Sequence, residues 1–139
     1  MTTIAQSEPT LDQRRAADAL AKIRELQNKG EEYYGHYVSY VSALPATIVM
    51  SGLGQALASE LAKAKGKAKD PHRLLYGHIA GWLSQQVSEL SGAPDQLIDR
   101  LMRAGQDVYV RAQAETMAYL NWLKQFARAY LKEKEGQGE

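Results

Sequence analysis

The sequence predicts an all-α fold, a single-domain bundle of about six helices that ends in a long C-terminal helix. Apolar residues recur every three or four positions along most of the 139 residues, and glycine, proline and capping residues divide the chain into segments of helical length. Neither an alternating strand pattern of useful length nor an internal repeat is present. We therefore expect a flexible lead-in at 1–9, a helical domain at 10–134 and a flexible tail at 135–139.

The first predicted helix begins after Pro9. Thr10 can cap it, and Gln13, three residues on, completes a capping box. An apolar stripe then follows at helical spacing until Gly30 ends the helix; it contains Ala16, Leu20, Ile23 and Leu26.

The segment 31–45 is rich in tyrosine and valine. One helical face would collect Tyr33, Tyr37, Val41 and Leu44, which favours a helix, although β-branched and aromatic residues also allow a strand. Pro45 suits the first position of a further helix. That helix would carry an i, i+4 stripe of Val49, Leu53, Leu57 and Leu61, flanked by small residues that invite a close helix neighbour: Gly52, Gly54, Ala56 and Ala58.

Three more helices are predicted beyond residue 69. Asp70 caps the first and Pro71 opens it, and its apolar face runs to Ser91-Gly92. Pro94 and Asp95 open a short helix that breaks at Gly105. Asp107 caps the longest segment, whose apolar stripe contains Tyr109, Ala112, Thr116, Tyr119, Leu123, Phe126 and Tyr130.

Composition excludes several classes of protein. The formal net charge is +1, so no overall field attracts nucleic acid, and any affinity for phosphate must come from local clusters. Cysteine is absent and the start has no signal-peptide pattern, from which we expect a cytoplasmic protein. The apolar stretches are shorter than the roughly 18 residues that span a bilayer.

No catalytic, metal or cofactor site is predicted. The spacing of His36, His72 and His78 gives no i, i+4 pair with a third ligand nearby, and no nucleophile arrangement has a recognisable signature. The stretch 46–58 resembles a strand, a Gly-x-Gly turn and a helix, but Leu57 occupies the third glycine position and no second strand precedes Asp70. We interpret these glycines as sites of close helix packing.

Clusters of basic residues are the one chemical hint of function. A flexible stretch carries alternating lysines with an arginine beyond them, and these could follow a phosphate backbone without reading sequence: Lys63, Lys65, Lys67, Lys69 and Arg73. A second stripe lies on the last helix at i, i+4 spacing: Lys124, Arg128 and Lys132. Both have an alternative interpretation, since cations also favour helix C-termini and solvated faces.

A helix-turn-helix is the alternative reading of the segment 73–105. The stretch SGAP would be its turn, and Gln96, Arg100 and Arg103 would lie on the second helix. That helix is short, and its arginines do not gather at its N-terminal end. A DNA-binding regulator is therefore the alternative function.

Two blocks of the sequence together resemble a known family. The first is YVSYVSALPATIVMSGLGQALA at 37–58, and the second is YVRAQAETMAYLNWLKQFARA at 109–129; Arg15-Ala16 also fits. In this order and separation they resemble the small all-helical subunit, subunit five, of the type III-B CRISPR effector, the Cmr complex. Ser51 and Ser59 depart from the pattern, which expects an asparagine and an aromatic residue there.

The resemblance implies a non-catalytic subunit of an RNA-targeting antiviral complex. Several copies would stack as a minor filament beside the backbone subunits that bind the guide RNA, and target RNA would lie between the filaments. The implied partners are thus the other Cmr subunits, further copies of the chain, and guide and target RNA. Assignment of the eight basic residues named above to RNA binding rests on their charge.

Overall fold

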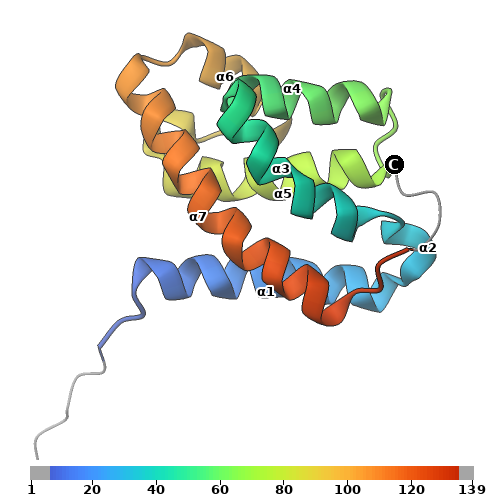
Figure 1. Ribbon diagram of the computed structural model, residues 1–139. Helices are drawn as coiled ribbons and strands as arrows, with labels where there is room; N and C mark the ends of the chain where they lie inside the picture. Colours follow the sequence, from blue (N-terminus) through green and yellow to red (C-terminus); the bar gives the residue numbers. More distant parts are fainter. Residues whose placement is uncertain (1–6, 135–139) are drawn as a thin grey trace, which may run out of the picture.

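Seven α-helices and two short 3-10 turns make up the described part of the chain. The computed structural model describes residues 7–134 (Figure 1). The helices are α1 (Leu11–Lys29), α2 (Glu31–Tyr34), α3 (Tyr37–Ser51), α4 (Leu53–Ala64), α5 (Pro71–Gln86), α6 (Leu97–Arg103) and α7 (Gln106–Tyr130), and the 3-10 turns η1 (Ser88–Leu90) and η2 (Pro94–Gln96) connect α5 to α6. The predicted all-α bundle with a long C-terminal helix is confirmed.

The predicted lead-in and the predicted tail fall only partly within the described residues. Residues 7–9 precede the first helix and are exposed, while 1–6 of the predicted lead-in and the tail 135–139 lie outside the described residues. Between residues 7 and 134, no helix combines the length and the apolar character needed to cross a bilayer.

The first and last long helices pack against one another. Figure 1 shows α7 crossing α1 along much of its length. From α1, Ala19, Ile23 and Leu26 are buried, and α7 contributes a longer buried face: Val108, Ala112, Thr116, Tyr119, Leu120, Leu123 and Ala127. The predicted capping box is present, since the Gln13 backbone N–H donates to Thr10 Oγ1 at 3.0 Å and the Thr10 N–H donates to Gln13 Oε1 at 2.7 Å. Gly30 ends α1 as predicted.

The region 31–61 is helical, but its helices are divided differently from the prediction. Pro45 lies inside α3, so the prediction that it starts a helix is wrong. The break comes instead at Gly52, whose φ of +87° suits glycine. Because α3 and α4 turn against one another there, the predicted continuous stripe is also wrong at Val49, which is 73% exposed while Ile48 is buried.

A close approach of helices occurs where the small residues were predicted to allow one. The backbone N–H of Gly54 donates to the Tyr109 hydroxyl at 2.7 Å, which joins the start of α4 to α7. A Cβ at Gly54 would lie 2.8 Å from Met102 Cε and 3.1 Å from the Tyr109 oxygen. A side chain at residue 54 would displace the flexible end of Met102 and crowd the Tyr109 hydroxyl, so glycine suits the close approach of α4 to α6 and α7.

The second half of the chain follows the predicted order with small shifts at the ends. Asp70 caps α5 by accepting a hydrogen bond from the His72 backbone N–H at 2.8 Å, and Pro71 is its first residue. The helix ends at Gln86, before the predicted Ser91-Gly92, because η1 follows. The last helix begins at Gln106 with Gly105 as its N-cap, where Asp107 was predicted to cap it.

Candidate nucleic-acid interface

Four lysines gather where α4 ends and α5 begins. We call the segment Lys63–Lys69 the lysine loop; the four are Lys63, Lys65, Lys67 and Lys69, and all are exposed. Lys65 ends α4 in the left-handed conformation, with a φ of 54°, and Gly66 follows with a φ of 77°. None of the four forms an ion pair with another of the residues 7–134. Their charges are therefore available to a ligand.

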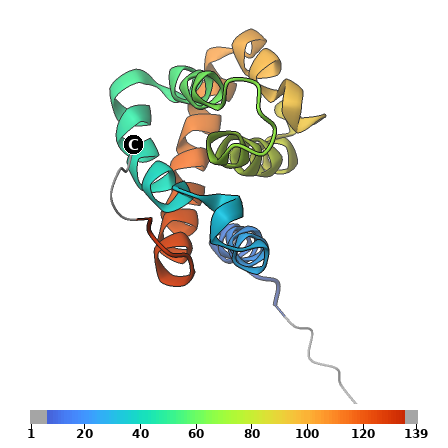
Figure 2. The same ribbon diagram turned by 90° about the vertical axis from the view of Figure 1, so that its right-hand side faces the viewer.

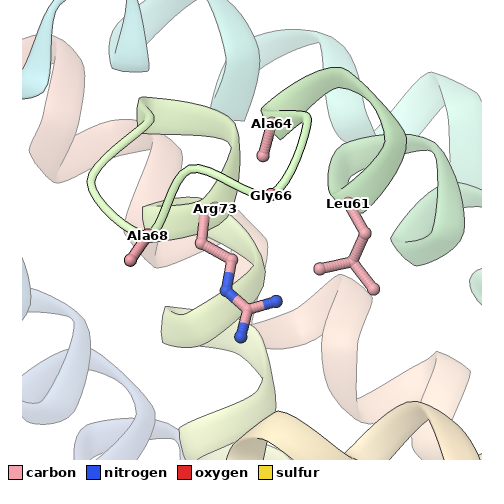
Figure 3. A pocket seen from close by; sticks show the side chains of 5 residues that line it. All are labelled: Leu61, Ala64, Gly66, Ala68 and Arg73. Carbon is pink, nitrogen blue, oxygen red and sulfur yellow. The ribbon is translucent and has the colours of Figure 1, made fainter.

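Two hollows lie beside the lysine loop. One, of about 420 Å³, is lined by Leu61, Ala64, Gly66, Ala68 and Arg73, and Figure 3 shows Arg73 and Leu61 on opposite sides of it. The other, of about 590 Å³, is lined by residues of three helices: Ser39, Tyr40, Ala43, Lys63, Lys65 and His72. The loop thus separates two recesses of the surface.

Arg73 has internal partners. Its guanidinium donates to Asp95 Oδ1 at 2.9 Å and lies over the Tyr76 ring, 5.1 Å from the ring centroid. These contacts tie α5 to η2. Of the predicted RNA-binding residues, Arg73 is therefore partly engaged in holding the fold.

Of the second predicted basic stripe, Lys124 and Arg128 lie on the C-terminal half of α7, whereas Lys132 lies beyond the end of that helix at Tyr130 and not on it as predicted. Lys124 is half-buried, while Arg128 and Lys132 are exposed. The Lys132 backbone N–H donates to the Tyr34 hydroxyl at 2.9 Å, which fixes this end of α7 against α2. Figures 1 and 2 both show the end of α7 on the other side of α2 from the lysine loop, so the structure does not bring the two clusters together.

A stacked histidine and tyrosine at the lysine loop were not predicted. The rings of Tyr40 and His72 are stacked with centroids 3.6 Å apart and an interplanar angle of 13°. His72 Nδ1 lies 2.8 Å from Oε1 of Glu60, which is buried. The three residues come from α3, α4 and α5, so only the tertiary fold brings them together.

His78 is a half-buried histidine at the packing of α5 against α3. Its Nδ1 lies 2.7 Å from the Tyr37 hydroxyl. Burial lowers the pKa of His78 from 6.5 to about 3, because the charged imidazolium would lose its hydration, and the charge of Lys22 acts in the same direction. Burial also raises the pKa of Tyr37, so this phenol stays protonated and can donate to the neutral imidazole.

Stability is expected to fall as the pH drops below about 6.5, because the unfolded chain then binds a proton that folded His78 takes up only near pH 3. A difference of one bound proton changes the free energy of unfolding by about 1.4 kcal/mol per pH unit. Lowering the pH from 6.5 to 5 should therefore lower the free energy of unfolding by about 2 kcal/mol. Urea unfolding at both pH values checks this. The variant His78→Gln should lose less over the same interval, and an unchanged pH dependence would contradict the assignment.

The second sequence block of the resemblance, 109–129, meets the N-terminal helix at one ion pair. Arg15 donates through Nε to Glu115 Oε2 at 2.7 Å and through Nη2 to Oε1 at 2.9 Å. The indole N–H of Trp82 donates to the same Oε2 at 2.8 Å. Burial on its own raises the pKa of Glu115, but the hydrogen bonds from Arg15 and Trp82 lower it below the usual value. The pair locks α1, α5 and α7 together.

One of the two arginines expected on a recognition helix, Arg100, is turned toward its own chain, while Arg103 is exposed. Arg100 donates through Nε to the Leu90 carbonyl at 3.0 Å and through Nη2 to the Ala93 carbonyl at 2.7 Å. It thereby holds the connection between η1 and η2, and α6 spans seven residues. The geometry gives no support to the helix-turn-helix alternative.

Comparison with known proteins decides the family. The family model of the CRISPR-associated protein Cas_Cmr5 matches residues 11–130. The chain belongs to the Cmr5 family. The match runs from α1 to the end of α7, so it includes the Arg15–Glu115 pair and the lysine loop. As a Cmr5 family member, the chain is a subunit of the type III-B CRISPR (Cmr) complex.

A solved structure supports the same family assignment. The chain is similar to the X-ray crystal structure of a CRISPR-associated Cmr5 family protein from Thermus thermophilus, with a TM-score of 0.70 and 29% sequence identity. The similarity covers 90% of this chain and 100% of the Thermus chain. The resemblance seen in the two sequence blocks is thus confirmed over nearly the whole Cmr5 fold.

Proposed function

We propose that the protein is a non-catalytic small subunit of the Cmr ribonucleoprotein in the cytoplasm. Several copies stack as a minor filament along the backbone subunits that carry the guide RNA, and they help to hold target RNA in antiviral defence. The observation that carries the RNA-holding role is the row of four exposed lysines without ion-pair partners among residues 7–134. Such cations contact phosphates without reading sequence.

Exposed apolar side chains support a protein contact at the opposite end of α4. Val49 and Met50 are 73% and 84% exposed, and Met102 and Val110 are each 57% exposed. We call these four residues the apolar end. The end of α3, α6 and the start of α7, which carry them, meet at the N-terminal end of α4, while the lysine loop follows its C-terminal end (Figure 1). Clustered exposed apolar residues are typical of protein interfaces.

Co-elution with the guide-loaded backbone subunit tests the subunit role. In size-exclusion chromatography, the protein is expected to elute with that ribonucleoprotein in a defined ratio. Met50→Lys should weaken the association while leaving the fold unchanged, since the side chain is already exposed. The matched control is Asn28→Lys, an exposed position on α1, outside the apolar end, that adds the same charge.

Failure of the unaltered protein to co-elute in a defined ratio would contradict the subunit role. If the protein co-elutes and both lysine variants behave alike, the subunit role stands and the apolar end is not the contact.

A further inference from the structure

The hollow between α3, α4 and α5 has a composition that suits a nucleotide. Building on the RNA-holding role above, we propose that it takes one nucleotide of single-stranded RNA, with the base against the Tyr40–His72 pair and a phosphate beside Lys63 and Lys65. Its volume of about 590 Å³ falls within the roughly 300–1,000 Å³ of small-molecule sites. The hollow offers both a flat aromatic wall and cations, the two features that bind single-stranded nucleic acid.

The aromatic wall is held in place before any ligand arrives. The Tyr40 and His72 rings are stacked at 3.6 Å, and Glu60 Oε1 lies 2.8 Å from His72 Nδ1. Asp70 accepts the His72 backbone N–H at 2.8 Å and so fixes the main chain at the same residue. A preorganised wall binds a base without first losing side-chain entropy.

The charges at the rim favour a phosphate. The carboxylates near it already have partners, because Glu60 is bound by His72 and Asp70 caps α5. Lys63 and Lys65 form no ion pair with the described residues 7–134. A phosphate held by these two ammonium groups therefore meets no unpaired carboxylate of Glu60 or Asp70.

The backbone conformation of Lys65 supports a binding role for its side chain. Its φ of 54° lies in the left-handed region, which a lysine occupies only at a cost that glycine does not have. Gly66 comes next, so a glycine one position earlier would end α4 with less strain. Strained non-glycine residues cluster at functional sites.

The row of cations continues beyond the hollow, which favours a polymer over a free nucleotide. Lys67 and Lys69 follow Lys65 along the same loop and are exposed. A strand with one base in the hollow would find further cations for its neighbouring phosphates. A free nucleotide would use only the first two lysines.

Equilibrium binding of the full chain to a single-stranded RNA of about ten nucleotides tests the inference, with fluorescence anisotropy as the measurement. The comparison RNA has the same length but an abasic ribose at every position. The wild type is expected to bind the base-bearing RNA at least fivefold more tightly, and 2-aminopurine at the centre should be quenched on binding. Tyr40→Leu should weaken binding of the base-bearing RNA about fivefold to 150-fold, the value of one base stack.

Two controls isolate the base contact from the charge contact. Tyr40→Phe keeps the ring and should bind like the wild type. The slope of binding against salt concentration should be the same in Tyr40→Leu and wild type, because no cation has been removed.

The outcomes separate this inference from the RNA-holding role. Equal binding of the base-bearing and abasic RNAs by the wild type overturns the nucleotide hollow, and salt-dependent binding in that case leaves the lysine loop in its role. No binding of either RNA at low salt overturns both. If Tyr40→Leu does not fold, the wild-type comparison of the two RNAs still decides. Tighter binding of a free 2-aminopurine nucleotide than of the RNA also overturns the proposal.

Discussion

Replacing Glu115 by alanine is expected to lower the free energy of unfolding by about 3 kcal/mol. Glu115 accepts two hydrogen bonds from Arg15 and one from the Trp82 indole, and its side chain is only 10% exposed. Without the carboxylate, Arg15, whose side chain is 17% exposed, keeps only its contact with the exposed Asp12, and the largely buried indole N–H of Trp82 loses its acceptor. Removing one partner of a buried ion pair lowers the free energy of unfolding by more than the intact pair contributes to it, because the other charge stays buried without its partner. Urea unfolding followed by circular dichroism measures the change.

Glu25→Ala is the matched control for this substitution. Glu25 is an exposed glutamate on α1, and no ion pair with another of the residues 7–134 involves it. Its replacement should change the free energy of unfolding by less than about 0.5 kcal/mol. If Glu115→Ala is no more destabilising than Glu25→Ala, the Arg15–Glu115–Trp82 cluster does not hold α1 in place.

Removing the four charges of the lysine loop is expected to weaken RNA binding about thirtyfold near physiological salt. Exposed ion pairs contribute about 0.5 kcal/mol each, so four contribute about 2 kcal/mol. The variant changes Lys63, Lys65, Lys67 and Lys69 to alanine. The slope of log affinity against log salt should also become shallower by about three, since each phosphate contact on a single strand contributes about 0.7.

A charge-matched variant shows whether the position of these cations matters. It changes four other exposed cations to alanine and so lowers the net charge by the same amount: Arg14, Arg24, Lys29 and Arg103. This control should bind RNA within a few-fold of the wild type, because its cations are dispersed over α1 and α6. Equal losses in both variants would mean that net charge, and not the lysine loop, governs the affinity.

Local signals in the sequence correctly predicted where α1 and α5 begin. Thr10 with Gln13, and Asp70 with Pro71, act on neighbouring backbone groups, so their effect does not depend on the rest of the fold. The predictions for Pro45 as a helix start and for Val49 as a buried residue were wrong because both depend on packing between distant parts of the chain. The division of α3 from α4 at Gly52 depends on how α4 packs against Tyr109, more than 50 residues away, a contact that no local pattern contains.

The candidate site was predicted only in its charged part. Alternating lysines around a glycine indicated an exposed basic segment, and their exposure in the structure agrees. Their assignment to RNA stays a prediction. The aromatic wall could not be predicted, because Tyr40, Glu60 and His72 are distributed over three helices and none has an unusual local spacing. The Arg15–Glu115 contact was out of reach for the same reason, at a separation of 100 residues.

The packing of α1 against α7 sets an order for folding during synthesis. The chief partner of α1 is α7, which is synthesised after the other six helices of residues 7–134. At about 5–20 residues per second, the 100 residues between Arg15 and Glu115 correspond to a delay of roughly 5–20 s. During that time Ile23 and Leu26 have no α7 to cover them, while α3, α4 and α5 can already pack together. The nascent chain therefore carries the uncovered apolar face of α1 until α7 has been synthesised, and α7 then covers that face.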